Sequence, residues 1–185
     1  MRIFALETDT EKLKKRFLSE GEQEVMMTYY HGLSFFFASL REMILTIILV
    51  AIGIAATVWG VPLGWTVGLL FLLWFVFVFF NLLRAYIDWT YDFILVTTDK
   101  IIFVDQTSIF RQEIKPLNLE NVGGVSTQTQ YWNIFPFGIV SVLLKEGLGG
   151  DRIVKKFVPR AQEVAAKISE VVTKYQRFDH LPEKQ

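Results

Sequence analysis

A long uncharged stretch constrains this chain more than any other feature. Between Met43 and Leu83 there is no Asp, Glu, Lys, Arg or His. A helix needs about 20 apolar residues to cross the hydrocarbon layer of a membrane, which is roughly 30 Å thick. The uncharged stretch is therefore long enough for two crossings.

The sequence Gly60-Val61-Pro62-Leu63-Gly64 interrupts this stretch near its middle. Proline lacks an amide donor and glycine favours turns, so the chain is expected to reverse there. We predict a transmembrane helical hairpin over residues 40–86, with spans at about 43–59 and 65–86. A soluble hairpin is disfavoured, because residues 71–80 are apolar on every side of a helix. A cleavable signal peptide is disfavoured because the apolar run is too long and begins well inside the chain.

Basic residues on both sides of the uncharged stretch predict the orientation of the hairpin. They precede this stretch at Lys12, Lys14, Lys15, Arg16 and Arg41 and follow it at Arg84, Lys100 and Arg111, whereas the turn between the spans carries no charge. Basic flanks stay in the cytoplasm, so we expect a plasma-membrane protein with two spans and with both termini cytoplasmic.

Small residues recur in the hairpin at Gly60, Gly64 and Gly68, with Gly53 before them. Four-residue spacing lets membrane helices approach closely, which makes Gly53, Gly64 and Gly68 candidates for helix packing. Turn formation beside Pro62 is the favoured explanation for Gly60 and Gly64. Asn81 is the most polar residue of either span, and we expect it to cap a helix or bond to a neighbouring one.

Residues 1–39 are predicted to form a basic, interfacial segment. Thr8 and Glu11 have the spacing of a helix capping box, and Leu13 and Phe17 fall one turn apart on one face. Such a helix would either lie on the anionic leaflet or remain solvated, and the residues do not decide between the two. In the first case its cations would contact lipid headgroups, namely Lys12, Lys14, Lys15 and Arg16.

Residues 87–176 are predicted to form a β-rich domain, followed by a polar tail at 177–185. Short runs of β-branched and aromatic residues predict strands at Asp92–Thr97, Lys100–Val104, Ile109–Lys115, Val125–Thr129, Gly138–Leu144 and Arg152–Val158, and Val25–Tyr30 has a similar composition. Pro159 opens a final helix whose apolar residues recur at helical spacing, at Val164, Ile168, Val171, Val172 and Tyr175.

Several segments resemble the bacterial pleckstrin-homology-like (PH-like) domains found next to membrane spans. They are Trp89–Val104, Leu117–Val122 and Gln128–Val140, together with Glu24 and His31 ahead of the first span. The resemblance implies an α+β protein in which a two-span hairpin is followed by a PH-like split β-barrel with a C-terminal helix. It implies no common biochemical activity.

Binding of phosphoinositides by such a domain needs several Lys or Arg residues on the first two strands and their connecting loop. The loop expected here, Thr97–Lys100, has one basic residue beside an acid, so specific recognition of inositol phosphates is not expected. Arg152, Lys155 and Lys156 are candidates for nonspecific headgroup contact, against a default of solvated strand faces.

Four aromatic residues surround Pro136, namely Tyr131, Trp132, Phe135 and Phe137. If they are exposed, they form a loop that faces a partner or the membrane. If they point inward, they belong to the core, which is the slightly favoured alternative.

The composition excludes several classes of function. A net charge of zero argues against a nucleic-acid-binding protein, and the absence of cysteine excludes disulfides and thiolate metal sites. His31 and His180 have no partners at metal-ligand spacing, and no catalytic motif is present. We therefore expect neither an enzyme nor a cofactor or small-molecule substrate.

The expected function is a membrane-anchored interaction module that contacts membrane lipids and binds another membrane protein or a second copy of itself. Two alternatives remain open at this point. One is an accessory subunit of a transport or export complex, and the other is a module that binds anionic lipids nonspecifically.

Overall fold

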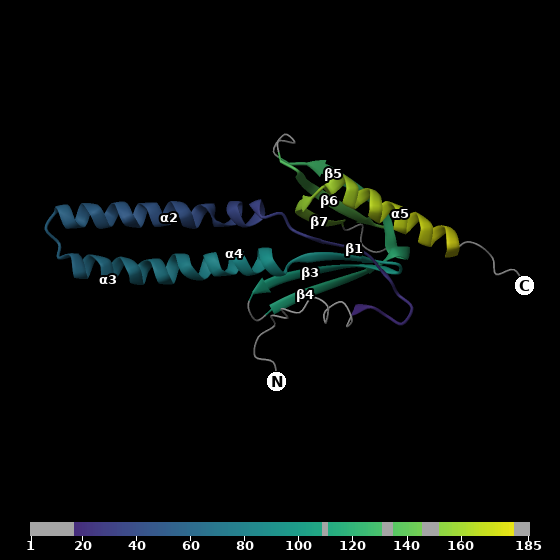
Figure 1. Cartoon of the computed structure of the whole chain (residues 1–185), viewed down its shortest axis with the longest axis horizontal. Helices are drawn as coiled ribbons and strands as arrows, with labels where there is room; N and C mark the ends of the chain where they lie inside the picture. Colours follow the sequence, from purple (N-terminus) through teal and green to yellow (C-terminus); the bar gives the residue numbers. More distant parts are fainter. Residues whose placement is uncertain (1–16, 109–110, 131–134, 146–151, 180–185) are drawn as a thin grey trace, which may run out of the picture. The chain divides into compact units, whose positions relative to one another are not determined.

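The computed structural model describes residues 17–108, 111–130, 135–145 and 152–179. The chain divides into two compact units (Figure 1). Gly32–Trp89 form the helical unit, whereas Met1–His31 and Thr90–Gln185 together form the second, β-rich unit. The β-rich unit is thus built from two stretches of sequence that lie on either side of the helical unit.

The helical unit is an antiparallel hairpin of two long helices. The first is α2 (Leu33–Val58), and the second runs continuously through α3 (Leu63–Trp74), the π-helical stretch η1 (Phe75–Phe79) and α4 (Phe80–Tyr91). Between them Gly60 takes a positive φ of 85°, a conformation that glycine adopts without strain. Both helices are long and apolar enough to cross a membrane, judged by length and composition.

Both helices extend beyond the predicted spans, so α2 includes two charged residues before the uncharged stretch. The Glu42 side chain is buried, and its Oε1 atom accepts a hydrogen bond of 2.5 Å from Nη2 of the exposed Arg41. The predicted span excluded both residues because a charge is costly in hydrocarbon.

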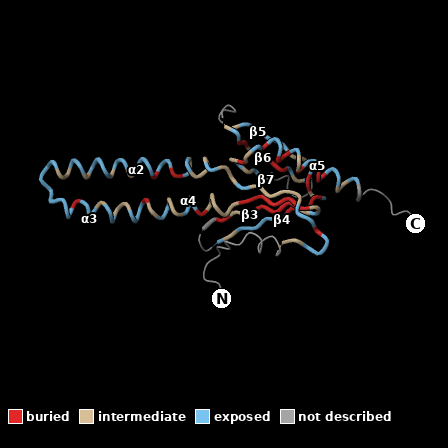
Figure 2. The backbone as a smooth tube through the Cα atoms, in the orientation of Figure 1, coloured by how far each residue is buried: buried red, intermediate tan, exposed pale blue. Residues whose placement is uncertain are grey.

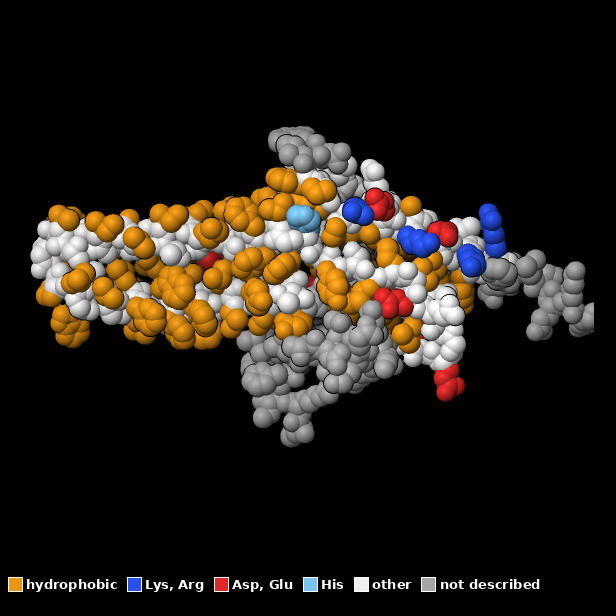
Figure 3. All heavy atoms as spheres, viewed as in Figure 1, with side chains coloured by type: hydrophobic (Ala, Val, Ile, Leu, Met, Phe, Trp, Pro, Cys, Tyr) orange, Lys and Arg blue, Asp and Glu red, His pale blue; other side chains and the backbone are white. Residues whose placement is uncertain are grey.

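The contacts between the two helices of the hairpin include a hydrogen bond and a close approach at a glycine. The indole Nε1 of Trp74 donates a hydrogen bond of 3.0 Å to Thr46 Oγ1. Closer to the tip of the hairpin, Gly53 leaves room for the Leu70 side chain, because a Cβ atom at Gly53 would lie 2.7 Å from Leu70 Cδ1. The outward side chains are apolar along both helices (Figure 3) and more than half exposed, including Ile47, Ile54, Val58, Leu63 and Phe71.

The residues predicted for helix packing therefore fall into two groups. Gly53 packs inside the hairpin, whereas a Cβ atom at Gly64 or Gly68 would meet no atom within 4 Å. The exposed Asn81 donates a hydrogen bond from Nδ2 to the Phe77 carbonyl oxygen, one turn earlier on its own helix. The side chain of Asn81 thus bonds locally rather than to the other helix of the hairpin.

The β-rich unit contains a four-stranded antiparallel sheet, sheet A, in the order β1-β2-β3-β4. Its strands are β1 (Glu24–Tyr29), β2 (Phe93–Thr97), β3 (Lys100–Ser108) and β4 (Arg111–Asn118). Strand β1 precedes the hairpin and β2 follows it, yet the two are hydrogen-bonded neighbours, with Tyr29 opposite Phe93. The hairpin is therefore inserted between the first two strands of this sheet.

A three-stranded antiparallel sheet, sheet B, has the order β5-β6-β7. After the short 3₁₀ turn η2 (Leu119–Asn121), the chain forms β5 (Val122–Thr129), β6 (Phe137–Leu144), β7 (Arg152–Pro159) and the helix α5 (Ala161–Asp179). The predicted strands and final helix lie where these elements are found, with ends that differ by a few residues. The described strands form two separate sheets, and no closed barrel is present among them.

The main core lies between the two sheets and α5 (Figure 2). Sheet A contributes alternate residues of its central strands, for example Ile94 and Phe103, and sheet B contributes Val140 and Val142. The predicted apolar face of α5 covers them, with Val164, Ile168, Val171 and Val172 buried and Tyr175 half-buried at the edge.

Gly138 allows the start of α5 to approach sheet B closely. A Cβ atom there would lie 2.8 Å from the Gln128 carbonyl oxygen and 3.0 Å from the Ala161 Cβ atom. Because backbone atoms cannot yield as a flexible side chain does, Gly138→Ala should lower the free energy of unfolding by about 1–3 kcal/mol. Chemical denaturation of the purified chain measures this loss. Gly124→Ala is the matched control on β5, where the added Cβ meets Leu143 at an ordinary 3.7 Å, and an equal loss in both variants would contradict the prediction.

Candidate interaction site

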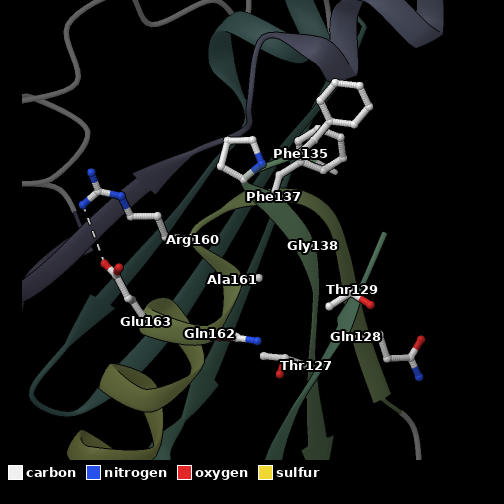
Figure 4. Close-up of a pocket in the computed structure, with 11 residues that line it drawn as sticks. Thr127, Gln128, Thr129, Phe135, Phe137, Gly138, Arg160, Ala161, Gln162 and Glu163 are labelled. Carbon is white, nitrogen blue, oxygen red and sulfur yellow. Dashed lines mark ion pairs between the residues drawn. The ribbon is translucent and has the colours of Figure 1, made fainter. Parts of the chain in front are cut away.

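A groove of about 270 Å³ lies beside β5, which is an edge strand of sheet B (Figure 4). One side is formed by the end of β5 and the start of β6, and the other by the first turn of α5. Its apolar lining comes from Phe135, Pro136 and Phe137, and its polar lining includes Thr127, Thr129 and Gln162. The groove thus combines an apolar end with hydroxyl and amide groups that can bond to a bound chain.

Local backbone geometry fixes the two sides of the groove. Arg160 turns the chain from β7 into α5 with a positive φ of 47°, and its amide donates a hydrogen bond of 3.0 Å to the Pro136 carbonyl oxygen. Its guanidinium lies 3.6 Å from the Glu163 carboxylate on the rim. Both side chains are about three-quarters exposed, so this ion pair adds little to stability.

Strand β5 forms one edge of sheet B, and among the described residues no strand pairs with its outer side. Its last four residues, Ser126 to Thr129, are exposed and uncharged. An edge strand presents unpaired backbone N–H and C=O groups, and natural proteins usually protect such edges with charges, proline or bulges. The exposed half of β5 has neither charge nor proline, so it remains able to pair with an added strand.

The predicted aromatic loop is partly core. Phe137 is buried, with its ring 5.5 Å from Phe135, 5.3 Å from Phe157 and 5.2 Å from His31. Phe135 is partly exposed and contributes to the groove. Tyr131 and Trp132 lie outside the described residues.

Phe157 adopts a strained backbone conformation that ties sheet B to the residues before α2. Its φ of 57° is unusual for a bulky side chain and coincides with a bulge in the pairing of β6 and β7. Gln130 Oε1 accepts a hydrogen bond of 3.0 Å from the Phe157 amide, and the Phe157 carbonyl accepts one of 2.9 Å from the His31 amide. His31 is thereby fixed to β7 two residues before α2 begins.

A buried acid holds the chain before β1 against sheet A. The Glu22 side chain is fully buried and accepts hydrogen bonds from the Ser19 amide at 2.7 Å and from the Thr97 hydroxyl. Its Oε2 atom also lies 3.0 Å from the Lys100 ammonium. Burial alone would raise the pKa of Glu22, but these bonds and the positive charge outweigh it and lower the pKa below its ordinary value.

A second, partly buried ion pair joins the two sheets. The Lys155 ammonium on β7 pairs with the Asp105 carboxylate on β3 and lies 5.5 Å from the centre of the Phe103 ring.

Tyr30 lies near two acids. Its burial, and then the negative charges of Asp105 and Asp92, raise the pKa of Tyr30. Asp92 Oδ1 also accepts a hydrogen bond of 2.5 Å from the Gln106 amide, which anchors the chain where it leaves α4.

These pairs revise the predicted lipid contacts. Lys155 is only 11% exposed and already neutralised, so it is not available to a headgroup. Arg152 and Lys156 are exposed. Arg152 begins β7, whereas Phe157, whose carbonyl oxygen accepts the bond from the His31 amide, lies near the end of that strand. Four further candidates lie outside the described residues, namely Lys12, Lys14, Lys15 and Arg16.

The prediction that Thr97–Lys100 connects the first two strands is also wrong. Thr97–Lys100 is the turn between β2 and β3, because β1 lies before the hairpin. The sequence pattern assigns no ion-pair role to Glu22 or Asp105. Their partners are far away in the sequence, 75 residues for Glu22 with Thr97 and 50 for Asp105 with Lys155, so no local spacing could reveal them.

No protein-family model matches the chain, and no curated protein matches its sequence. The chain is similar to a crystal structure described as a DUF1696 family protein with a pleckstrin-homology domain from Shewanella loihica. The two are 8% identical, the match covers 90% of this chain and 99% of the other, and the TM-score is 0.44.

The Glu22 carboxylate should make stability depend on pH. Because its folded-state pKa is below the ordinary 4.5, its stabilisation is complete above that pH and is lost as the pH falls through the lower folded-state pKa. Glu22→Gln should therefore cost about 2 kcal/mol at pH 7 and progressively less below pH ~4.5. Denaturation midpoints of both proteins between pH 3 and pH 7, taken about every half unit, measure the difference.

Glu20→Gln serves as the control, since Glu20 is exposed and lies two residues away. A difference between wild type and Glu22→Gln that stays constant down to the lowest pH would show that the charge of Glu22 is not what stabilises the fold.

Proposed function

We propose that the β-rich unit is a PH-like domain with a membrane hairpin inserted into its first loop. The support is the order of its elements, with four antiparallel strands, then three, then a C-terminal helix that covers the core between the sheets. In a PH-like domain the first strand pairs with the second, and here that pair is β1 and β2. The hairpin occupies the position of their connecting loop.

The hairpin, in this proposal, spans a bacterial plasma membrane with both of its ends in the cytoplasm. Its apolar, exposed side chains would be unfavourable in water by about 25 cal/mol for each Å² of apolar surface. The residues that join it to the β-rich unit are few: Tyr30, His31 and Gly32 before α2, and Asp92 after α4. Three extended residues reach about 10 Å, so the PH-like domain would stay at the inner surface of the membrane.

The orientation is testable with single cysteines, because the chain has none of its own. A cysteine at Gly64, in the turn region, should react in intact cells with a maleimide that cannot cross membranes. A cysteine at Gln185 should react only after the membrane is opened. Labelling of the Gln185 cysteine in intact cells would contradict cytoplasmic termini.

We infer that the module binds a protein partner and is not an enzyme. The observation that carries this function is the groove between the unpaired edge of β5 and the start of α5. An extended segment of another membrane protein, or of a second copy, can add to β5 through backbone hydrogen bonds and place a side chain against Phe135 and Pro136. The buried Glu22 and the partly buried Asp105 are already engaged in ion pairs that join elements of the fold.

A photo-crosslinking residue in place of Thr127, in the groove, tests this function in native membranes. The same residue at Gln112, on the outer strand β4 of sheet A, is the matched control. Adducts should form from position 127 and not from 112, and Thr129→Lys should remove them because it places a charge on the β5 edge. Equal adducts at both positions, or none at 127, would exclude the groove as the binding site.

The alternative, an accessory subunit of a transport or export complex, is favoured by the open space at Gly64 and Gly68 on the hairpin. Small residues without neighbours leave room for a helix of another protein. A third crosslinking probe at Gly68 distinguishes the two functions. Protein adducts from position 68 without any from 127 would favour assembly through the hairpin.

A further inference from the structure

A second cavity, of about 480 Å³, lies further along α5 than the groove does. Its other wall is formed by the start of β1 and the turn between β2 and β3. Pockets that hold small molecules have volumes of about 300–1,000 Å³, so this cavity is large enough for one. The helical wall consists of side chains on one face of α5, namely Lys167, Glu170, Val171, Lys174 and Tyr175.

Hydrogen bonds hold both walls of this cavity in place. On the helix, Gln176 Nε2 donates a hydrogen bond of 3.1 Å to the Val122 carbonyl oxygen, which fixes the end of α5 to β5. On the sheet, the Thr98 amide donates a hydrogen bond of 3.0 Å to the Gln23 carbonyl oxygen. The cavity is therefore formed before a ligand binds, and a preformed site lowers the entropic cost of binding.

The uncharged part of the lining combines apolar side chains with a hydroxyl group. Val171 is buried in the main core, and Val25 and Tyr175 are partly buried against the same core. Thr98 Oγ1 accepts a hydrogen bond of 3.3 Å from the Gln23 amide, so its hydroxyl hydrogen can still be donated. A ligand can thus place an apolar group against the core and a hydrogen-bond acceptor beside Thr98.

The charged part of the lining favours an anion, because two lysines and one glutamate give it a net charge of +1. Lys167 pairs with Glu170 at 2.9 Å, but their side chains are 43% and 63% exposed, so this ion pair is weak and can exchange for another partner. Lys174 forms no ion pair with any residue that the structure describes. The two lysines are seven residues apart, roughly 10 Å along the helix axis, so both can reach one small ligand.

We propose that this cavity binds a small organic anion, in which a phosphate or carboxylate group is attached to an apolar body. Lys174 and the Thr98 hydroxyl bind the anionic group through charge-assisted hydrogen bonds. The apolar body lies against Val25, Val171 and the ring of Tyr175. The site does not depend on the groove, which lies beside β5 and the first turn of α5.

Anionic lipid headgroups share this chemistry, and the position of the cavity argues against them. The pairing of Tyr29 with Phe93 is next to the hairpin, whereas Val25 and Thr98 are at the other ends of their strands. From Phe93 to Thr98 the chain extends for about 17 Å, which exceeds the Debye length of about 8 Å at physiological salt. A soluble anion is therefore favoured, and this preference rests on the proposed location of the hairpin in a membrane.

Phenyl phosphate is the probe, titrated into the full chain in phosphatidylcholine nanodiscs and followed by saturation-transfer NMR. Lys174→Gln should weaken its binding about tenfold, because it removes a charged partner of the phosphate. Glu170→Gln should tighten binding about threefold, because it removes a like charge and releases Lys167. Lys156→Gln, at an exposed lysine of β7, is the matched control and should change binding by less than about twofold.

Lys174 and Glu170 are exposed, so neither substitution removes a contact of the core. Equal binding in wild type and Lys174→Gln, or no saturation transfer to phenyl phosphate, would overturn the site. A second titration in nanodiscs that contain phosphatidylglycerol separates the two sources of anion, and there the affinity should stay within about twofold. Loss of the Lys174-dependent binding in these nanodiscs would show that a lipid headgroup occupies the cavity and would overturn the soluble ligand.

Discussion

The pairing of β1 with β2 is the constraint on which the rest of this structure depends. The two strands are direct neighbours in sheet A although the entire hairpin lies between them in sequence. The chain must therefore leave the sheet beside Phe93 and return to the same place. This explains why the residues at both crossings are fixed, His31 by the carbonyl of Phe157 and Asp92 by the amide of Gln106.

Polar contacts between residues far apart in sequence also fix this arrangement of strands, because apolar packing is not directional. Glu22 and Lys100 hold the entry to β1 against the turn between β2 and β3, and Asp105 and Lys155 join sheet A to sheet B. Removing one partner of such a pair lowers stability because it leaves the other charge unpaired. Each pair therefore fixes the position of one part of the β-rich unit against another. Such contacts matter in this domain because the helical hairpin separates its first strand from the other strands in sequence.

Much of the fold could be predicted from the sequence, because its strongest signals are local. The uncharged stretch from Met43 to Leu83 predicts two long apolar helices, and the strands and α5 follow from residue type and periodicity. The partner of β1 could not be predicted, since pairing depends on contacts across the hairpin. For the same reason the sequence predicts Thr97–Lys100 as the first loop of the domain, although it connects β2 and β3. The groove depends on Gly138 and Arg160, whose importance appears only when α5 is placed against sheet B.

Disulfide formation across β1 and β2 tests the central claim most directly, in a chain that has no cysteine of its own. Met27 and Leu95 are opposite each other and share the outer face of sheet A. Cysteines at these two positions should crosslink within the full chain under mild oxidation, whereas cysteines at Met27 and Ile94, which point to opposite faces, should not. Equal crosslinking in both pairs, or none in either, would contradict the pairing of β1 with β2.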